Sequence, residues 1–479
     1  MEGEGALADR QNDFSKGSIP RNIMSLAVPM TAAQLVNVLY SVVDRIYLGH
    51  LPESDSLALT GLGVTMPIVS ILMGFANLCG TGGAPLCSIS RGKGDDREAE
   101  RVMGNAFVLL LMLGAASTAF FLALKGPILY LFGASSGTFP YADAYMSIYL
   151  CGTLFVMISL GMNPFINAQG FGRVGMMTVL LGAVVNIVLD PVLIFVFHMG
   201  VQGAALATVA SQGLSAAWVL SFLTGRKAVL RLRLQDLRLE RGRTGRIVSL
   251  GLSGFFVNMT NSLVQVVCNA TLQSYGGDLY VGVMTIINSI REVFIMPVQG
   301  LTNGSQPVAG YNYGAKQYAR VRQCIRFSVG ATVAYSTLFW AAAMSFPGPL
   351  IHIFKSDSAV LEAGVPTLRI YFGLFIFMSL QIAGQGVFVG LGRSKQAVFF
   401  SLLRKAIVNA PLTMLLPVWM GTDGVFVAEA VSQLVGGLAC FSTMYFTVYR
   451  PLGRLACAPP GASEDPCGPG RSPTPPPGG

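Results

Sequence analysis

The chain has 479 residues, of which 52% are hydrophobic and only 11% are charged, and its mean hydropathy is +0.59. A soluble globular protein carries about 25% charged residues, so this composition excludes that class. The formal net charge of +9 would suit a nucleic-acid-binding protein in a soluble chain, but here the basic residues lie between long apolar segments, and we expect no nucleic-acid partner.

Apolar segments, each close to the ~20 residues that a membrane-crossing helix needs, follow one another along nearly the whole chain. The first is longer than the core of a signal peptide and follows a polar, acidic segment, so we expect it to be retained as a helix. The pattern predicts an all-α polytopic membrane protein with twelve transmembrane helices. In chain order, the predicted spans are 22–48, 57–84, 103–124, 142–163, 174–197, 200–223, 247–272, 277–305, 322–345, 364–391, 396–419 and 421–449.

Basic residues mark alternate loops of this pattern. They follow the second, fourth, sixth, eighth and tenth spans, whereas the intervening loops read LPESDS, YGGD and KSDSAVLE. Because Lys and Arg accumulate in cytoplasmic loops, we expect a multi-pass protein of the plasma (inner) membrane with both termini in the cytoplasm. The segment RLRLQDLRLERGRTGR after the sixth span fits either an amphipathic helix on the membrane surface or a solvated cytoplasmic linker.

Three segments of the first half reappear in the second half at a nearly constant spacing. GVQGAALATVASQ at 200–212 corresponds to GTDGVFVAEAVSQ at 421–433, and GPILYLFGASS at 126 corresponds to GPLIHIFKSDS at 348. NAQGFGR at 167 corresponds to VGLGR ending at Arg393, so the offsets are 220 to 222 residues. Each half holds an even number of predicted helices, so the repeats are parallel. Two such lobes suit alternating access to a cleft between them.

The repeat predicts a division of the chain into five parts. An N-lobe at 22–223 and a C-lobe at 247–449 each hold six spans, and the basic cytoplasmic linker 224–246 joins them. A cytoplasmic tail precedes them at 1–21, and the Pro- and Gly-rich cytoplasmic tail 450–479 is expected to be disordered.

One carboxylate lies inside an otherwise apolar run, NIVLDPVLIF at 186–195. A charged acid in the middle of a membrane costs about 2.5–3.5 kcal/mol, so we expect Asp190 to face a cavity, to be paired or to hold a proton. Asn186 lies one helical turn earlier on the same face, and Pro191 leaves the carbonyl of Ile187 without its helical donor. These oxygen ligands suit Na⁺, and an apolar setting that raises the pKa of a carboxyl also suits H⁺. At offset 220 the second half keeps the helix break at Pro411 but has Ala410 in place of the acid.

Several motifs in this order resemble the multidrug and toxic compound extrusion (MATE) family, especially its DinF-like bacterial branch. They are VPMTAAQLVNVLYSVVDRIYLGHL and ALTGLGVTMPI near the start, NPFINAQGFGR, NIVLDPVLIF, and MPVQGLTNGSQPVAGYNYGAKQYARV at 296–321. The resemblance covers roughly 20–450. It implies a V-shaped, two-lobed bundle of twelve helices that acts as an antiporter, exporting organic cations, often aromatic drugs, in exchange for Na⁺ or H⁺.

The resemblance also implies a cation-coupling site in the N-lobe. Matching motif to motif places it at Asp44 in VVDRIY, at Asn186 and Asp190 in NIVLDP, and at Thr208 in GAALATVASQ. The same four residues would hold Na⁺ if sodium is the coupling ion, and no other cofactor is implied. Asp190 capping a broken helix and Asp44 pairing with Arg45 are the structural alternatives, and Asn186 and Thr208 as polar contacts between helices are another.

The second half carries its own charged residues inside predicted spans. Arg291 and Glu292 lie in the eighth span and Glu429 in the twelfth, and either acid is a candidate for a second coupling or drug-attracting group. An ion pair or gating contact between Arg291 and Glu292 is the alternative. The side chains that we predict to line the substrate cleft are Gln34, Asn37, Met66, Gln265, Glu292, Gln299 and Glu429.

The sequence favours a monomeric secondary-active exporter of small molecules over three other classes. A lipid-linked oligosaccharide flippase, or an exporter of a metabolite, shares the architecture; a flippase would need a cleft rich in Arg or Lys, whereas the buried charge near the predicted cleft is largely acidic. A channel would need a continuous polar lining. An enzyme would need a reactive cluster, and the eight Cys and three His are scattered singly. The choice between Na⁺ and H⁺ stays open.

Overall fold

The computed structural model describes residues 12–49, 56–354 and 358–457, apart from the side chains of 40–46, 48–49, 56–60, 262 and 278. The described residues form helices joined by short turns. The first half holds α1 (Ile19–Gly49), α2 (Ser56–Gly92), α3 (Asp96–Leu131), α4 (Phe139–Cys151), α5 (Thr153–Ala168), α6 (Gly172–Pro191), the π-helix η2 (Val192–Val196) and α7 (Gly200–Thr224).

The second half begins with α8 (Arg241–Gly314), which bends at Gly277, where φ is 62°. It continues with α9 (Tyr318–Ser345), α10 (Pro347–His352), α11 (Ser358–Phe372), α12 (Phe375–Gly390), α13 (Ser394–Leu402), the π-helix η4 (Leu403–Asn409), α14 (Ala410–Leu415), α15 (Pro417–Met420), α16 (Thr422–Met444), the π-helix η5 (Tyr445–Tyr449) and α17 (Arg450–Cys457).

The helices have the length and hydropathy of a multi-pass membrane protein. Ten of the described helical segments can cross a membrane, or up to twelve if each of two bent pairs counts as one span. The bent pairs are α4 with α5 (57°) and α11 with α12 (44°), and they occupy corresponding places in the two halves. The prediction of an all-α polytopic protein is therefore confirmed, and each predicted span falls on a helix, a part of α8, or a bent or broken helix.

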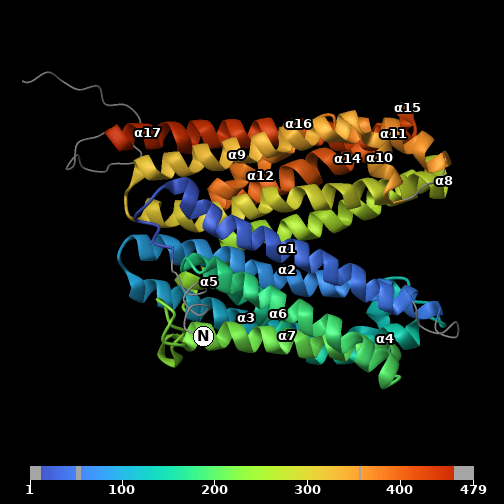
Figure 1. The fold of residues 1–479 in the computed structure, drawn as a ribbon, viewed down its shortest axis with the longest axis horizontal. Helices are drawn as coiled ribbons and strands as arrows, with labels where there is room; N and C mark the ends of the chain where they lie inside the picture. The colour runs from blue at the N-terminus through green and yellow to red at the C-terminus, as the bar shows by residue number, and fades with distance from the viewer. Residues whose placement is uncertain (1–11, 50–55, 355–357, 458–479) are drawn as a thin grey trace, which may run out of the picture.

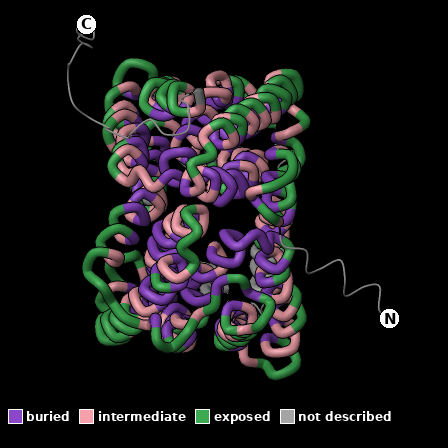
Figure 2. The backbone as a smooth tube through the Cα atoms, turned by 90° about the vertical axis from the view of Figure 1, so that its left-hand side faces the viewer, coloured by how far each residue is buried: buried purple, intermediate pink, exposed green. Residues whose placement is uncertain are grey.

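The two halves of the chain form two bundles that lie side by side. In Figure 1, α1 to α7 occupy the lower bundle and α9 to α17 the upper one, with α8 along their boundary. Helices α1 and α2 contact α8 and so join the bundles. Buried residues gather inside both bundles and between them, whereas exposed residues lie on the outside, as Figure 2 shows. Many of the exposed residues are large and apolar, such as Leu131, Leu338 and Trp419, and in a membrane protein such side chains face lipid.

The seam between α2 and α8 is built from glycines. A Cβ atom placed on any of four of them would fall only 1.9 to 2.1 Å from a backbone carbonyl oxygen of the facing helix. Because no real side chain tolerates such a contact, glycine is what allows the two backbones to meet here. The four glycines are Gly82 and Gly92 on α2, and Gly251 and Gly314 on α8.

The basic linker is neither of the two structures that the sequence suggests. Between the end of α7 and the start of α8 at Arg241, the helical part is Leu234–Asp236, a single 3₁₀ turn, so the prediction of an amphipathic surface helix is wrong for 225–240. The last six residues of the predicted linker, 241–246, form the start of α8 instead. A fully solvated linker is also wrong, because Leu230 is buried and Asp236 pairs with Arg97 of α3 at 3.1 Å. The backbone N–H of Arg231 donates to Glu100 of α3 at 3.1 Å, which ties the linker to the end of the first bundle.

Candidate functional site

A cavity of about 270 Å³ lies in the first bundle, walled by α1, α2, α5, α6 and α7 and by the second part of α8. Its described lining is rich in amides and hydroxyls and contains no charged side chain. Small and apolar residues fill the rest of the wall. The polar side chains include Gln34, Asn37, Asn77, Asn163, Asn167, Asn186, Gln212 and Asn303.

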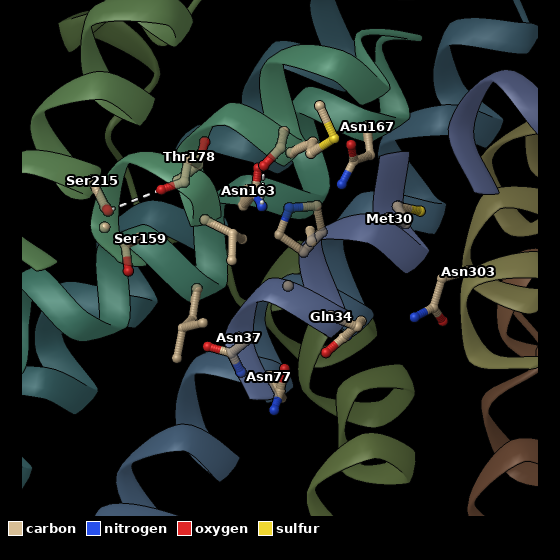
Figure 3. Close-up of a pocket in the computed structure, with 18 of the residues that line it drawn as sticks. Met30, Gln34, Asn37, Asn77, Ser159, Asn163, Asn167, Thr178, Ser215 and Asn303 are labelled. Carbon is tan, nitrogen blue, oxygen red and sulfur yellow. Dashed lines mark hydrogen bonds between the residues drawn. The ribbon is translucent and has the colours of Figure 1, made fainter. Parts of the chain in front are cut away.

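The polar side chains come from opposite sides of this cavity. Figure 3 shows Gln34 and Asn37 of α1 near Asn77 of α2, with Asn303 of α8 lying apart from them on the helix of the other bundle. Amides offer both donors and acceptors without a fixed charge, so the wall can bind a polar or cationic group in several orientations. Gln34 and Asn37, which we predict to line the substrate cleft, both line this cavity, and their role in binding a substrate stays a prediction.

Asn186 and Asp190 connect the cavity to a buried acid. They lie one turn apart on α6, where the Asn186 amide donates to Oδ1 of Asp190 at 3.3 Å. Their exposed fractions are 2% and 0%. Asn186 lines the cavity and Asp190 lies one turn beyond its lining. The side-chain oxygen of Asn186 is buried without a hydrogen-bond partner among the described residues, so it is a candidate cation ligand beside the carboxylate.

The two prolines of the repeat both lie beside π-helical turns. Helix α6 ends at Pro191, and the chain continues as the π-helix η2, where Phe197 N–H donates to the carbonyl of Val192 at 3.0 Å. In the second half the order is reversed, since the π-helix η4 precedes Pro411 at the start of α14. A proline that cannot donate to the preceding turn accounts for the change in helix type after Pro191.

The other two residues of the expected cation site are less directly placed. Thr208 is half-buried on α7, and its hydroxyl donates to the carbonyl of Ala204 at 2.9 Å, within its own helix. Asp44 belongs to α1, but its side chain lies outside the described residues. Among the described residues of the expected site, the structure shows a direct side-chain contact between Asn186 and Asp190.

A second, smaller cavity of about 30 Å³ lies in the second bundle. Glu429 of α16 lines it and is buried, with an exposed fraction of 4%. The Lys405 ammonium donates to both oxygens of the Glu429 carboxylate at 3.1 Å, and the Asn409 amide also donates to it. Thr413 in turn donates to the side-chain oxygen of Asn409 at 3.1 Å, so the group forms one hydrogen-bonded network.

The expectation that the buried charge is largely acidic is wrong for this bundle. Arg291 and Lys405 line the small cavity beside Glu429, and Arg404 is buried next to Lys405. Glu292, predicted as a cleft residue or as the partner of Arg291, is exposed and lies outside both cavities. The sequence signal for the missed bases was present, since LLRKAIVNAP puts Arg404 and Lys405 inside a predicted span.

Three further predicted cleft residues lie in different surroundings. Gln265 lines the small cavity, where it donates to Asn269 at 2.9 Å and accepts from Asn288 at 3.1 Å. Met66 and Gln299 are exposed and line neither cavity, which corrects that part of the prediction. Successive residues of a helix differ by about 100° in direction, so the bounds of a span do not say which of its polar residues faces inward.

Comparison with known proteins identifies the fold. The MatE family model matches residues 29–192 and 255–415, which together make up more than half of the chain. The chain belongs to the MatE family. This agrees with the resemblance in its motifs. The first matched stretch includes most of the residues that line the larger cavity, and the second includes most of those that line the smaller one.

Relatives of this MatE protein cover nearly its whole length at low identity. It is 24% identical over 434 residues to the multidrug export protein MepA of Staphylococcus saprophyticus, covering 90% of this chain and 95% of that one. It is 23% identical over 444 residues to MepA of Staphylococcus haemolyticus, covering 92% and 96%. A solved outward-facing multidrug resistance MATE transporter of the MOP superfamily matches with a TM-score of 0.86 at 20% identity, over 93% of this chain and 99% of that one.

Proposed function

We propose that this MatE protein is a secondary-active multidrug exporter that releases organic cations in exchange for Na⁺ or H⁺. The observation that carries the proposal is the Asn186–Asp190 pair, because it joins a polar, uncharged cavity to a fully buried carboxylate on a broken helix. The names of the MepA relatives support export of drugs, and the family supports transport across a membrane.

Asn186 is the residue through which a bound ion can change the binding of the substrate, and the substrate the binding of the ion. It lines the cavity where the substrate binds and also donates to Asp190, where the coupling ion binds. A cation on Asp190 competes for the Asn186 side chain and so changes the wall that the substrate contacts. A ligand shifts a conformational equilibrium only by its different affinity for the two states, and this shared residue supplies that difference.

The break in the helix at Pro191 provides a place where α6 and η2 can bend relative to each other during transport. A π-helical turn already replaces regular hydrogen bonding after Pro191, so α6 and η2 can change their angle with little loss of backbone bonding. The glycine seam of α2 and α8 closes the bundles against each other near their predicted cytoplasmic ends. We infer that the described state is outward-facing and that this seam opens in the inward-facing state.

The test is gradient-driven export of the fluorescent cation rhodamine 123 from proteoliposomes. Wild-type protein should export the dye when a Na⁺ or a proton gradient is imposed. The gradient that drives export identifies the coupling ion. Asp190→Asn should abolish gradient-driven export while keeping a hydrogen-bond partner for Asn186. The matched control is Asp423→Asn, which changes an exposed acid at the start of α16 and should leave export unchanged.

Two results would contradict different parts of this proposal. Wild-type protein that exports no dye under either gradient would reject a drug antiporter. Asp190→Asn that exports the dye at the wild-type rate would leave the antiporter in place and give Asp190 a structural role.

A further inference from the structure

The small cavity of the second bundle is bordered by more positive than negative charge. It lies among both parts of α8, α11, η4 and α16, and its charged lining consists of Arg291, Lys405 and Glu429. Arg404 adds a third positive charge beside Lys405, and it interacts electrostatically with Glu429 and Arg291. The nearby acid Glu292 interacts electrostatically with Arg291, but its side chain is exposed and does not line the cavity.

Glu429 is already satisfied by its own neighbours. Lys405 donates to both of its carboxylate oxygens at 3.1 Å, and Asn409 donates as well. The Lys405 ammonium and the Glu429 carboxylate therefore cancel in charge and in hydrogen bonding, as a buried pair must if it is to be stable. The two arginines are left without a buried acid of their own among the described residues.

Both arginines keep unused donors in this region. Nε of Arg291 and Nη1 of Arg404 are buried and have no hydrogen-bond partner among the described residues. Arg404 has an exposed fraction of only 7%. Arg291 also bonds to the Tyr371 hydroxyl, but a guanidinium donor that is buried without a partner is costly, because it loses water and gains no hydrogen bond. The arrangement therefore points to a negatively charged ligand.

We propose that this cavity binds a monovalent anion, either the carboxylate group of a zwitterionic substrate or a chloride ion. Its volume of about 30 Å³ holds one carboxylate group or one chloride but not a diphosphate. The guanidinium of Arg291 matches a carboxylate in shape and charge, and the Tyr371 hydroxyl on the same wall can donate to the ligand. For the carboxylate, the proposal rests on the proposed export function, since it widens the substrate class from cations to zwitterions.

Two dyes with the same aromatic core separate the possibilities. Rhodamine 123 is a cationic methyl ester, and rhodamine 110 is its free acid, with a carboxylate in place of the ester. Equilibrium binding of each dye to the purified full-length protein is measured by fluorescence polarisation, in sodium chloride and in sodium methanesulfonate, whose anion is bulkier than chloride and carries no carboxylate. For a carboxylate site, chloride should weaken the binding of rhodamine 110 relative to methanesulfonate and leave rhodamine 123 unaffected.

Arg291→Gln is the variant that tests the site directly. It should weaken rhodamine 110 binding by about tenfold or more, the loss expected for one charge-assisted hydrogen bond, and change rhodamine 123 binding by less than about twofold. The matched control is Arg326→Gln, which changes an exposed arginine of α9 in the same bundle and should affect neither dye. Arg291→Lys keeps the charge and should retain part of the binding if the site is an anion site.

The outcomes are distinct. If chloride raises the melting temperature of wild-type protein and not of Arg291→Gln, while the two dyes behave alike, the anion is chloride. The anion site is rejected if Arg291→Gln is monodisperse and binds both dyes as wild type does in either salt, and if chloride does not change the melting temperature of wild-type protein. The proposed export function would stand in that case. If wild-type protein binds neither dye, the proposed drug-export function fails, and chloride-dependent melting alone then decides the anion site.

Discussion

Lys405 donates two hydrogen bonds of 3.1 Å to the carboxylate of Glu429. Aligning 200–212 with 421–433 places Glu429 at the position that Thr208 holds in the first half. The first bundle carries a buried acid in the middle of its bundle on α6, as Asp190, whereas the second carries one on α16. The acid has changed helices between the two halves, and in the second half a lysine neutralises it.

This difference assigns different tasks to the two bundles. Under the proposed function, a cation that binds at Asp190 arrives and leaves, whereas the Lys405 ammonium is attached to the chain and keeps Glu429 occupied. The proposal therefore assigns cation exchange to the first bundle and not to the second. Its remaining positive charge is available for an anion instead.

We expect Lys405→Met to destabilise the protein strongly. The substitution leaves Glu429 as a buried carboxylate without its cation, which costs about 3 to 5 kcal/mol in free energy of unfolding. The double variant Lys405→Met with Glu429→Gln removes both charges and should recover most of that loss. Thermal unfolding in detergent measures both, with the exposed Lys395→Met as control. A single variant as stable as wild type would show that the pair is not needed for stability.

The spacing of residues within one helix was readable from the sequence, but contacts between helices were not. Asn186 and Asp190 are four residues apart, so helical geometry alone places them on one face, and they do form a hydrogen bond. Lys405 and Glu429 are 24 residues apart on different elements, and only the packing of η4 against α16 brings them together. Met66 and Gln299 were misplaced for the same reason, because their helices turn them away from both cavities.

The helical architecture was predictable because hydropathy and length decide it. Every backbone group in a membrane must be bonded internally, so each long apolar segment becomes a helix. The bends were harder to predict. Pro191 predicted a break in its helix, but nothing local distinguishes the glycines of the α2–α8 seam from the rest of the 56 in the chain. Their role depends on the backbone of a helix more than 150 residues away.

Asn186→Ala should weaken the link between ion and substrate. The variant loses the hydrogen bond to Asp190 and one wall group of the large cavity. We expect the concentration of Na⁺ or H⁺ that displaces bound rhodamine 123 to change by about tenfold, the effect of one lost hydrogen bond to a charged group. Asn163→Ala is the matched control, since Asn163 lines the same cavity but donates to the carbonyl of Gly175. It should alter dye affinity alone. Equal ion dependence in the two variants would contradict the role given to Asn186.

Pro191→Ala and Pro411→Ala should differ in their effects on transport. Alanine at 191 restores a backbone donor and favours a continuous α-helix where the structure has α6 followed by η2. We expect export to slow by about tenfold, corresponding to about 1.4 kcal/mol in activation free energy, with dye binding retained. Pro411→Ala lies beyond η4 in the bundle whose acid is neutralised, so export should stay near the wild-type rate. Equal slowing in both variants would mean that the breaks serve the fold rather than coupling.

Gly92→Ala should prevent the two bundles from closing at the α2–α8 seam. The new methyl group would lie 1.9 Å from the carbonyl oxygen of Tyr311, a backbone atom that cannot turn aside. Gly330→Ala on α9 is the control, because a Cβ there meets nothing within 4 Å. Spin labels on cysteines introduced at the exposed positions Arg173 and Lys395, in a chain whose eight native cysteines are replaced, report the separation of the bundles by double electron–electron resonance. We expect the distance distribution to move to longer values in Gly92→Ala alone, with loss of export. An unchanged distribution would show that the seam opens or closes independently of this contact.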